Sequence, residues 1–97
     1  MIMTTPTDHD QVLVRLQTIV TTIASPHRTP ADVGPGTALG HGGFWLDSIA
    51  LLEVIIACEA EFGVTFDSDT DLTARSLENI GSLAELILTR MILTKGR

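Results

Sequence analysis

A chain of 97 residues has room for one domain, and its 44% hydrophobic and 19% charged residues are typical of a folded, soluble protein. Twelve acidic against six basic residues give a net charge of −6, which disfavours nucleic acid as a partner because phosphate binding needs a basic face. The single cysteine excludes an intramolecular disulfide and a cysteine-rich zinc site. The first residues lack the pattern of a secretory signal and no apolar run is long enough to span a bilayer, so we expect a cytoplasmic domain.

The first predicted element is a helix over Thr7 to Ala24. Its apolar residues recur at intervals of three and four, which places them on one stripe that a core can bury. The residues of this stripe are Val12, Leu13, Leu16, Ile19, Val20 and Ile23. Thr7, with Asp10 three positions later, resembles a helix start, because acids in the first turn interact favourably with the helix dipole. We expect Ser25 and Pro26 to end the helix, since proline lacks the N–H of the next helical hydrogen bond.

A long connection follows over residues 25–46, with three prolines and five glycines. A connection of this length inside a compact domain is usually either functional or disordered. Its apolar residues predict points at which the connection is anchored to the core, and these are Val33, Leu39, Phe44 and Trp45.

The second helix is predicted to begin at Asp47 and Ser48 and to end near Phe62, where Gly63 provides a stop signal. At about 100° per residue, its apolar side chains fall on two nearly opposite arcs. The arc expected to face the core holds Leu51, Val54, Ile55, Cys58 and Phe62. The other arc holds Ile49, Leu52 and Ile56, beside Glu53 and Ala60. This second apolar arc either faces a binding partner or is buried under the long connection.

The last third of the chain predicts an acidic turn at Asp67 to Asp71, a single short helical turn at Thr73 to Ser76, and a helix from about Asn79 to Leu93. The last helix carries Ile80, Leu83, Ile87 and Met91 at helical spacing. The predicted fold class is therefore all-α, a four-helix bundle of three main helices plus one short helix with a long first loop. We expect residues 1–97 to form a single domain, with its helical core at about 7–93.

The charge of the chain is unevenly distributed. From His41 to Glu85 there are nine acids and one base, Arg75, which gives this stretch −8 and the rest of the chain +2. Such a field favours a cationic partner surface and speeds its encounter, although a solvated acidic surface also serves solubility alone.

Residues of catalytic type do not assemble into a recognisable enzyme motif. Asp47 and Ser48 are both favoured helix caps. Ser48 lacks the glycines of the Gly-x-Ser-x-Gly nucleophile elbow, and the faint oxyanion-loop pattern of residues 41–43 has no suitably placed His/Asp pair. Cys58 lies on the core arc and is expected to be a small buried hydrophobe. We therefore assign no catalytic residue.

The acidic turn has part of the spacing of a calcium-binding loop. Asp67, Asp69, Asp71 and Glu78 fall at the positions of EF-hand acids. However, Leu72 stands where the sharp turn requires glycine, and Arg75 brings an adverse charge to the ninth position. We predict no metal requirement and at most a weak cation site.

Taken together, the run from Leu46 to Val64, LDSIALLEVIIACEAEFGV, resembles the acyl carrier proteins. In that family an Asp-Ser-Leu tripeptide opens the second of four helices after a long first loop. The helix then follows an apolar pattern that ends in acidic residues, phenylalanine, glycine and an aliphatic residue, as it does here. Residues 12–23 and 79–87 resemble the first and fourth helices of the family, so the resemblance covers most of the chain.

The resemblance implies that Ser48 carries a 4′-phosphopantetheine arm through a phosphodiester, and that Asp47 helps place the cofactor phosphate and metal during its attachment. It also implies that a set of residues on the second helix meets partner enzymes, namely Ile49, Leu52, Glu53 and Ile56. The chain itself would not be an enzyme. It would be a free-standing, monomeric carrier that holds an acyl or aminoacyl group as a thioester.

The implied partners are a phosphopantetheinyl transferase, an acyl- or aminoacyl-loading enzyme, and a ketosynthase, acyltransferase or condensation enzyme of a polyketide, fatty-acid-like or nonribosomal-peptide pathway. The chain departs from the family where Ile49 replaces the usual leucine and Trp45 stands at a position that is often glycine. Ala50 and Ala60 occupy positions that are usually polar or acidic. The Leu-Asp-Ser-Ile context and the glycine-rich loop favour a specialised-metabolite pathway, such as antibiotic biosynthesis.

Two other classes of function remain open from the sequence. The chain is alternatively a helical interaction domain that keeps the fold but never receives the arm, or a small metal-binding regulator that uses the Asp67 to Asp71 loop. Modification of Ser48 separates the first alternative from a carrier, and a calcium titration tests the second.

Overall fold

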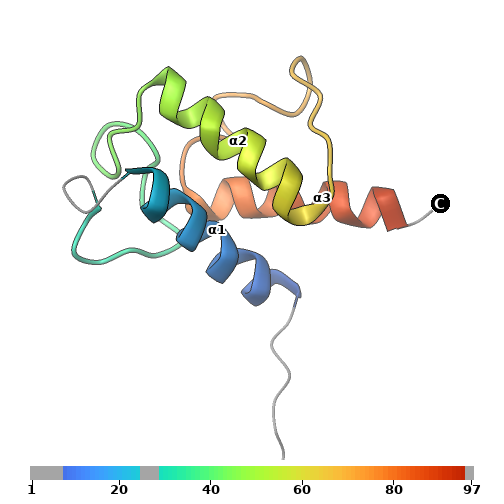
Figure 1. Ribbon diagram of the computed structural model, residues 1–97, viewed down its shortest axis with the longest axis horizontal. Helices are drawn as coiled ribbons and strands as arrows, with labels where there is room; N and C mark the ends of the chain where they lie inside the picture. The colour runs from blue at the N-terminus through green and yellow to red at the C-terminus, as the bar shows by residue number, and fades with distance from the viewer. Residues whose placement is uncertain (1–7, 25–28, 96–97) are drawn as a thin grey trace, which may run out of the picture.

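The computed structural model describes residues 8–24 and 29–95, and in these ranges the chain is all-helical with no β-strand (Figure 1). Its helices are α1 (Asp8–Ala24), α2 (Ser48–Phe62) and α3 (Ile80–Lys95). The three main helices predicted from apolar periodicity are thus confirmed to within two residues at each described end. The predicted start at Thr7 and the predicted stop at Ser25 and Pro26 lie outside the described residues.

The core lies where α1 packs against both other helices. Its buried side chains come from all three helices and from the two connections between them: Val12, Leu16, Val20, Ala24, Leu39, Phe44, Val54, Ile55, Cys58, Val64, Phe66, Ile80, Leu83, Ala84 and Ile87. Among the described residues, none of the fully buried side chains is polar or charged. Burial of this apolar surface is the main force that holds the helices together.

The long connection is anchored to the core at three of the four predicted residues. Leu39 and Phe44 are fully buried, and Val33 packs against the core from its edge. The prediction for Trp45 is wrong, because its side chain is 54% exposed. The backbone of Trp45 has a φ of 57°, in the left-handed region. In this conformation the Trp45 side chain is exposed, although its neighbours in the sequence are apolar.

Backbone hydrogen bonds join the long connection to the start of α3. Leu39 N donates to Glu78 O (3.1 Å), and Ile80 N donates to Thr37 O (3.1 Å). Gly81 N donates to Pro35 O (2.7 Å). Figure 1 shows the connection, in green, at the end of the molecule where α3 begins. The segment before α2 is therefore held against a second, distant part of the chain.

The connection between α2 and α3 begins at Gly63, which has a left-handed φ of 66° and ends α2 as predicted. The Glu59 carboxylate accepts a hydrogen bond from Phe66 N (2.9 Å) and so fixes the first residues of this connection against α2. The short helical turn predicted at Thr73 to Ser76 is not confirmed as a helix: residues 74–77 form a turn, in which Leu77 N donates to Thr73 O (3.0 Å).

The start of α3 is capped by reciprocal hydrogen bonds. Asn79 N donates to Ser82 Oγ (3.1 Å), and Ser82 N donates to Asn79 Oδ1 (2.7 Å). These bonds satisfy backbone N–H groups that have no partner within the helix. Among the described residues, no helix combines the length and the apolar composition needed to cross a membrane.

We predict that Gly43→Ala destabilises the fold. A Cβ at this buried position would overlap the carbonyl oxygen of Ala38, which the loop fixes by accepting a hydrogen bond from Phe44 N (2.9 Å). The expected loss is about 1–3 kcal/mol or more in urea denaturation, as for other overpacked sites.

Gly40→Ala is the matched control in the same loop, because a Cβ there has open space around it and the backbone φ is not positive. Its stability should be unchanged or raised by about 0.4–1 kcal/mol. Equal losses for the two variants would contradict the close approach of the backbone at Gly43.

Candidate functional site

The candidate site is built at the N-terminus of α2. Asp47 is the N-cap residue, and its Oδ1 accepts a hydrogen bond from Ala50 N (2.7 Å) while its carbonyl accepts from Leu51 N (2.9 Å). The Asp47 carboxylate therefore performs the capping role that the sequence alone allows for either residue. Ser48 is the first residue of the helix and is exposed. Its hydroxyl is presented to solvent at the positive end of the helix dipole.

The second apolar arc of α2 is exposed. Ile49 is 72% exposed, Ile56 55% and Leu52 54%. Glu53 and Ala60 on the same side are also exposed, whereas Val54, Ile55 and Cys58 on the opposite side are buried. Of the two possibilities left open by the sequence, burial of this arc under the long connection is thus excluded. We call Ile49, Leu52, Glu53 and Ile56 the exposed face of α2.

An aromatic pair lies on the loop that leads into the site. The rings of His41 and Trp45 meet edge-on, with centroids 4.3 Å apart and an interplanar angle of 73°. Trp45 precedes Ser48 by three residues, and both residues of the pair are exposed. His41 and Trp45 therefore lie close in sequence to the predicted site residues, which are Asp47, Ser48 and the exposed face of α2. The sequence alone did not assign these two residues to the site.

Carboxylates near the far end of α2 have structural partners. Glu61 forms an ion pair with Arg15 of α1 (3.3 Å), and Glu59 binds Phe66 N. Glu53 lies instead among exposed apolar side chains, and Asp47 lies one residue before Ser48. Both acids are exposed, and one oxygen of Asp47 is used to cap the helix.

The acidic turn is organised by its own backbone. Asp67 Oδ1 accepts hydrogen bonds from Asp69 N (2.8 Å) and Thr70 N (3.2 Å), and these bonds hold the pKa of the Asp67 carboxyl below its usual value. Asp71 Oδ2 accepts from Asp67 N (2.7 Å) and lies 3.6 Å from Arg90 Nε. Among the described residues, no group of three or more acidic, histidine or cysteine side chains is arranged to hold a metal ion.

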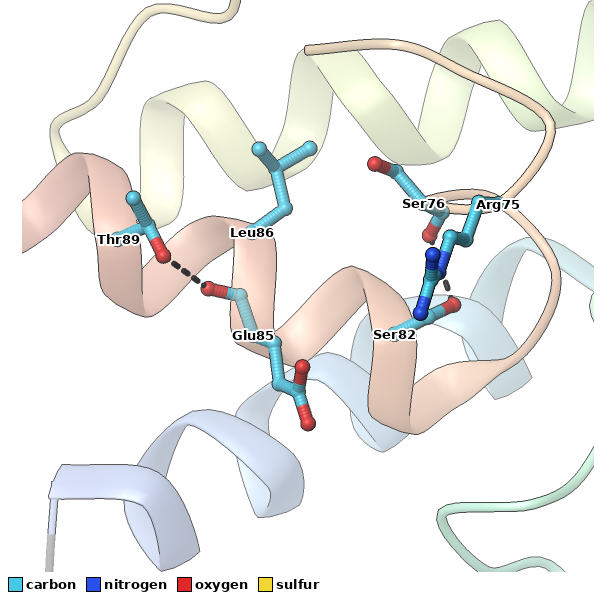
Figure 2. Close-up of a pocket in the computed structure, with 6 residues that line it drawn as sticks. All are labelled: Arg75, Ser76, Ser82, Glu85, Leu86 and Thr89. Carbon is cyan, nitrogen blue, oxygen red and sulfur yellow. Dashed lines mark hydrogen bonds between the residues drawn. The ribbon is translucent and has the colours of Figure 1, made fainter.

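A shallow depression of about 260 Å³ lies on α3 and the turn before it (Figure 2). It is lined by Arg75, Ser76, Ser82, Glu85, Leu86 and Thr89. Two of its hydroxyl groups are used within the protein, because Ser82 Oγ donates to Ser76 O (2.9 Å) and Thr89 Oγ1 donates to Glu85 O (2.9 Å), as Figure 2 shows. The depression brings no acid–base pair together and shares no residue with the site at α2.

No protein-family model matches the chain, and neither a curated protein nor a solved structure matches it. Assignment of a function therefore depends on the geometry at the start of α2 and on the sequence around it.

We predict that the two neighbouring isoleucines of α2 respond oppositely to truncation. Ile55→Ala should cost about 2–5 kcal/mol in urea denaturation, because Ile55 is buried in the core. Ile56→Ala should change stability by no more than about 0.5 kcal/mol, because its side chain is exposed. A large loss for Ile56→Ala and none for Ile55→Ala would mean that α2 is rotated relative to the core.

We also predict that Cys58 is unreactive in the folded protein. Burial of its thiol, followed by the charges of Glu59 and Glu61, raises the pKa to about 12. A raised pKa keeps the thiol neutral, and the thiolate is the reactive form. At pH 8, Ellman's reagent should therefore label Cys58 only after guanidinium is added, and rapid labelling of the native protein would contradict the burial.

Proposed function

We propose that the protein is an acyl carrier protein that holds an acyl or aminoacyl group as a thioester on a 4′-phosphopantetheine arm at Ser48. The observation that carries the proposal is the exposed hydroxyl of Ser48 at the start of α2, with capping left to Asp47 and an apolar, acidic face beside it. The resemblance of residues 46–64 to the carrier family supports the same assignment. The protein would be a substrate and partner of enzymes and not a catalyst.

The residues at the start of α2 fit the chemistry of arm attachment. A phosphate ester at Ser48 would lie at a helix N-terminus, where backbone N–H groups and the dipole favour negative charge. In the attachment step, Ser48 Oγ forms a bond to phosphorus while the pyrophosphate bond of coenzyme A breaks and 3′,5′-ADP leaves. The serine proton passes to a base of the transferase. Asp47, exposed and adjacent, would assist in placing the phosphate and the metal that accompanies it.

The exposed face supports transient docking of successive enzymes. Its three apolar side chains provide contact area, and Glu53 provides a charge that orients the partner. A flexible arm then presents the thioester to each active site at a high effective concentration. Charges that act mainly on the association rate suit a carrier, because each complex has to separate before the next one forms.

The proposed family fold has a short helix between its second and last helices. The turn at residues 73–77, closed by the hydrogen bond from Leu77 N to Thr73 O, would occupy that place in a four-helix bundle. The connection over residues 25–47 would be the long first loop that precedes the modified serine. We propose a specialised-metabolite pathway, of polyketide, fatty-acid-like or nonribosomal-peptide type, as the setting.

The test is intact-mass analysis after incubation with coenzyme A, magnesium and a broad-specificity phosphopantetheinyl transferase. We expect one arm per wild-type chain and none on Ser48→Ala. Ser68→Ala is the matched control, because Ser68 is also an exposed serine that directly follows an aspartate, and this variant should be modified fully.

An unmodified wild-type chain would contradict the carrier function and favour a helical interaction domain that never receives the arm. Modification of Ser48→Ala would overturn the choice of serine. A large gain of helix content with calcium, measured by circular dichroism, would favour the metal-binding regulator, although the carboxylates of the acidic turn already accept backbone hydrogen bonds.

A further inference from the structure

Trp45 is held in an unfavourable position close to Ser48. A left-handed backbone is strained for a bulky side chain, and exposure of an indole forgoes the stabilisation that its burial would give. The loop nevertheless fixes this conformation, since Trp45 N donates to Gly40 O (2.9 Å) and Leu46 N donates to Leu39 O (3.0 Å). The preceding residue, Phe44, is fully buried and anchors the segment to the core. Strain of this kind is characteristic of functional segments.

The indole is also oriented. The edge-on contact with His41, at a centroid distance of 4.3 Å, limits the directions that the Trp45 ring takes. An exposed aromatic side chain with few free rotations loses little entropy when a partner covers it. Tryptophan is accordingly among the residues that most often dominate the binding energy of an interface.

Trp45 lies only three residues before Ser48, close enough to contact an enzyme that acts on that serine. Consecutive Cα atoms are about 3.8 Å apart, so the Cα atoms of residues 45 and 48 lie at most about 11 Å from each other. A standard interface covers about 800 Å² on each partner, a patch wider than this distance. An interface of this size centred on Ser48 would reach Trp45 as well.

The charges around the indole indicate the chemistry of that enzyme surface. Exposed Asp47 precedes α2 and exposed Glu53 is its sixth residue, and both lie within the stretch from His41 to Glu85 that carries −8. Cationic side chains are attracted both to these carboxylates and to the face of an indole ring. The complementary surface is an apolar recess with lysine or arginine at its rim.

We propose that Trp45, oriented by His41, is the anchor through which the enzyme that modifies Ser48 docks onto this protein, and that it inserts into an apolar recess rimmed by basic residues. The proposal rests on the proposed function, because it names the partner of the same site. It extends the docking surface from the exposed face of α2 onto the loop before it, where the sequence had predicted a core residue.

The test measures the kinetics of Ser48 modification, by intact mass, for the wild type and Trp45→Gly with a broad-specificity phosphopantetheinyl transferase. Glycine accepts the left-handed backbone, so the variant should melt at the same or a higher temperature. We expect at least a tenfold higher KM with little change in kcat, as for the loss of a binding contact. Trp45→Phe should recover most of the loss, and Ile92→Ala, which removes a 67% exposed side chain on α3, should behave as wild type.

A second measurement uses the fact that Trp45 is the sole tryptophan of a chain without tyrosine. Titration with a tryptophan-free form of the transferase, without coenzyme A, should shift its emission to shorter wavelength as the indole leaves water. Equal KM values for Trp45→Gly and the wild type, or an unshifted emission while the wild type is modified, would overturn this proposal and leave the carrier function intact. An unmodified wild type would overturn both.

Discussion

Backbone pairing between the long connection and the start of α3 is the constraint on which the geometry at Ser48 depends. The hydrogen bonds of Leu39 and Ile80 to residues of the opposite segment leave the chain only a few residues in which to reach α2. The tight turn through Gly43 uses those residues, and Phe44 fixes them to the core. The beginning of α2 is therefore positioned by a distant part of the sequence. The described part of this loop, although rich in glycine and proline, is thus held in place by backbone hydrogen bonds and by buried side chains.

The two faces of α2 differ in their surroundings, one being buried in the core and the other exposed to solvent. Val54, Ile55 and Cys58 give the helix its place in the core, and the opposite face keeps three large apolar side chains in water. Nothing in the fold gains from that exposure, because each side chain would be more favourable if it were buried. Exposed apolar faces of this size often mark contact surfaces, and the docking role that we propose for this one rests on its position next to the exposed Ser48.

Periodicity in the sequence was sufficient to predict the three helices and both arcs of α2, because side-chain direction in a helix follows from residue spacing alone. The loop could not be predicted in the same way. Trp45 lies between Phe44 and Leu46 and reads as a core residue, but a single left-handed φ reverses its direction. The contact of Trp45 with His41 is likewise a product of loop conformation. Periodicity also could not decide whether residues 73–77 form a short helix, because a single hydrogen bond, from Leu77 N to Thr73 O, closes this turn and does not extend into a helix.

The acidic residues fall into two groups: those that contribute only to the overall negative field of the protein, and Glu53, which lies on the exposed face of α2. Asp67, Asp71, Glu59 and Glu61 each use one carboxylate oxygen to accept a backbone N–H group or to pair with an arginine, and these contacts hold their charges in place. They contribute a long-range attraction for a basic surface, which salt weakens over about 10 Å at 0.1 M. Glu53 lies within the apolar face and is placed for direct contact. On the proposed function, a partner attracted by the whole acidic region would be oriented near the start of α2, where exposed Ser48 and exposed Trp45 lie within three residues of each other.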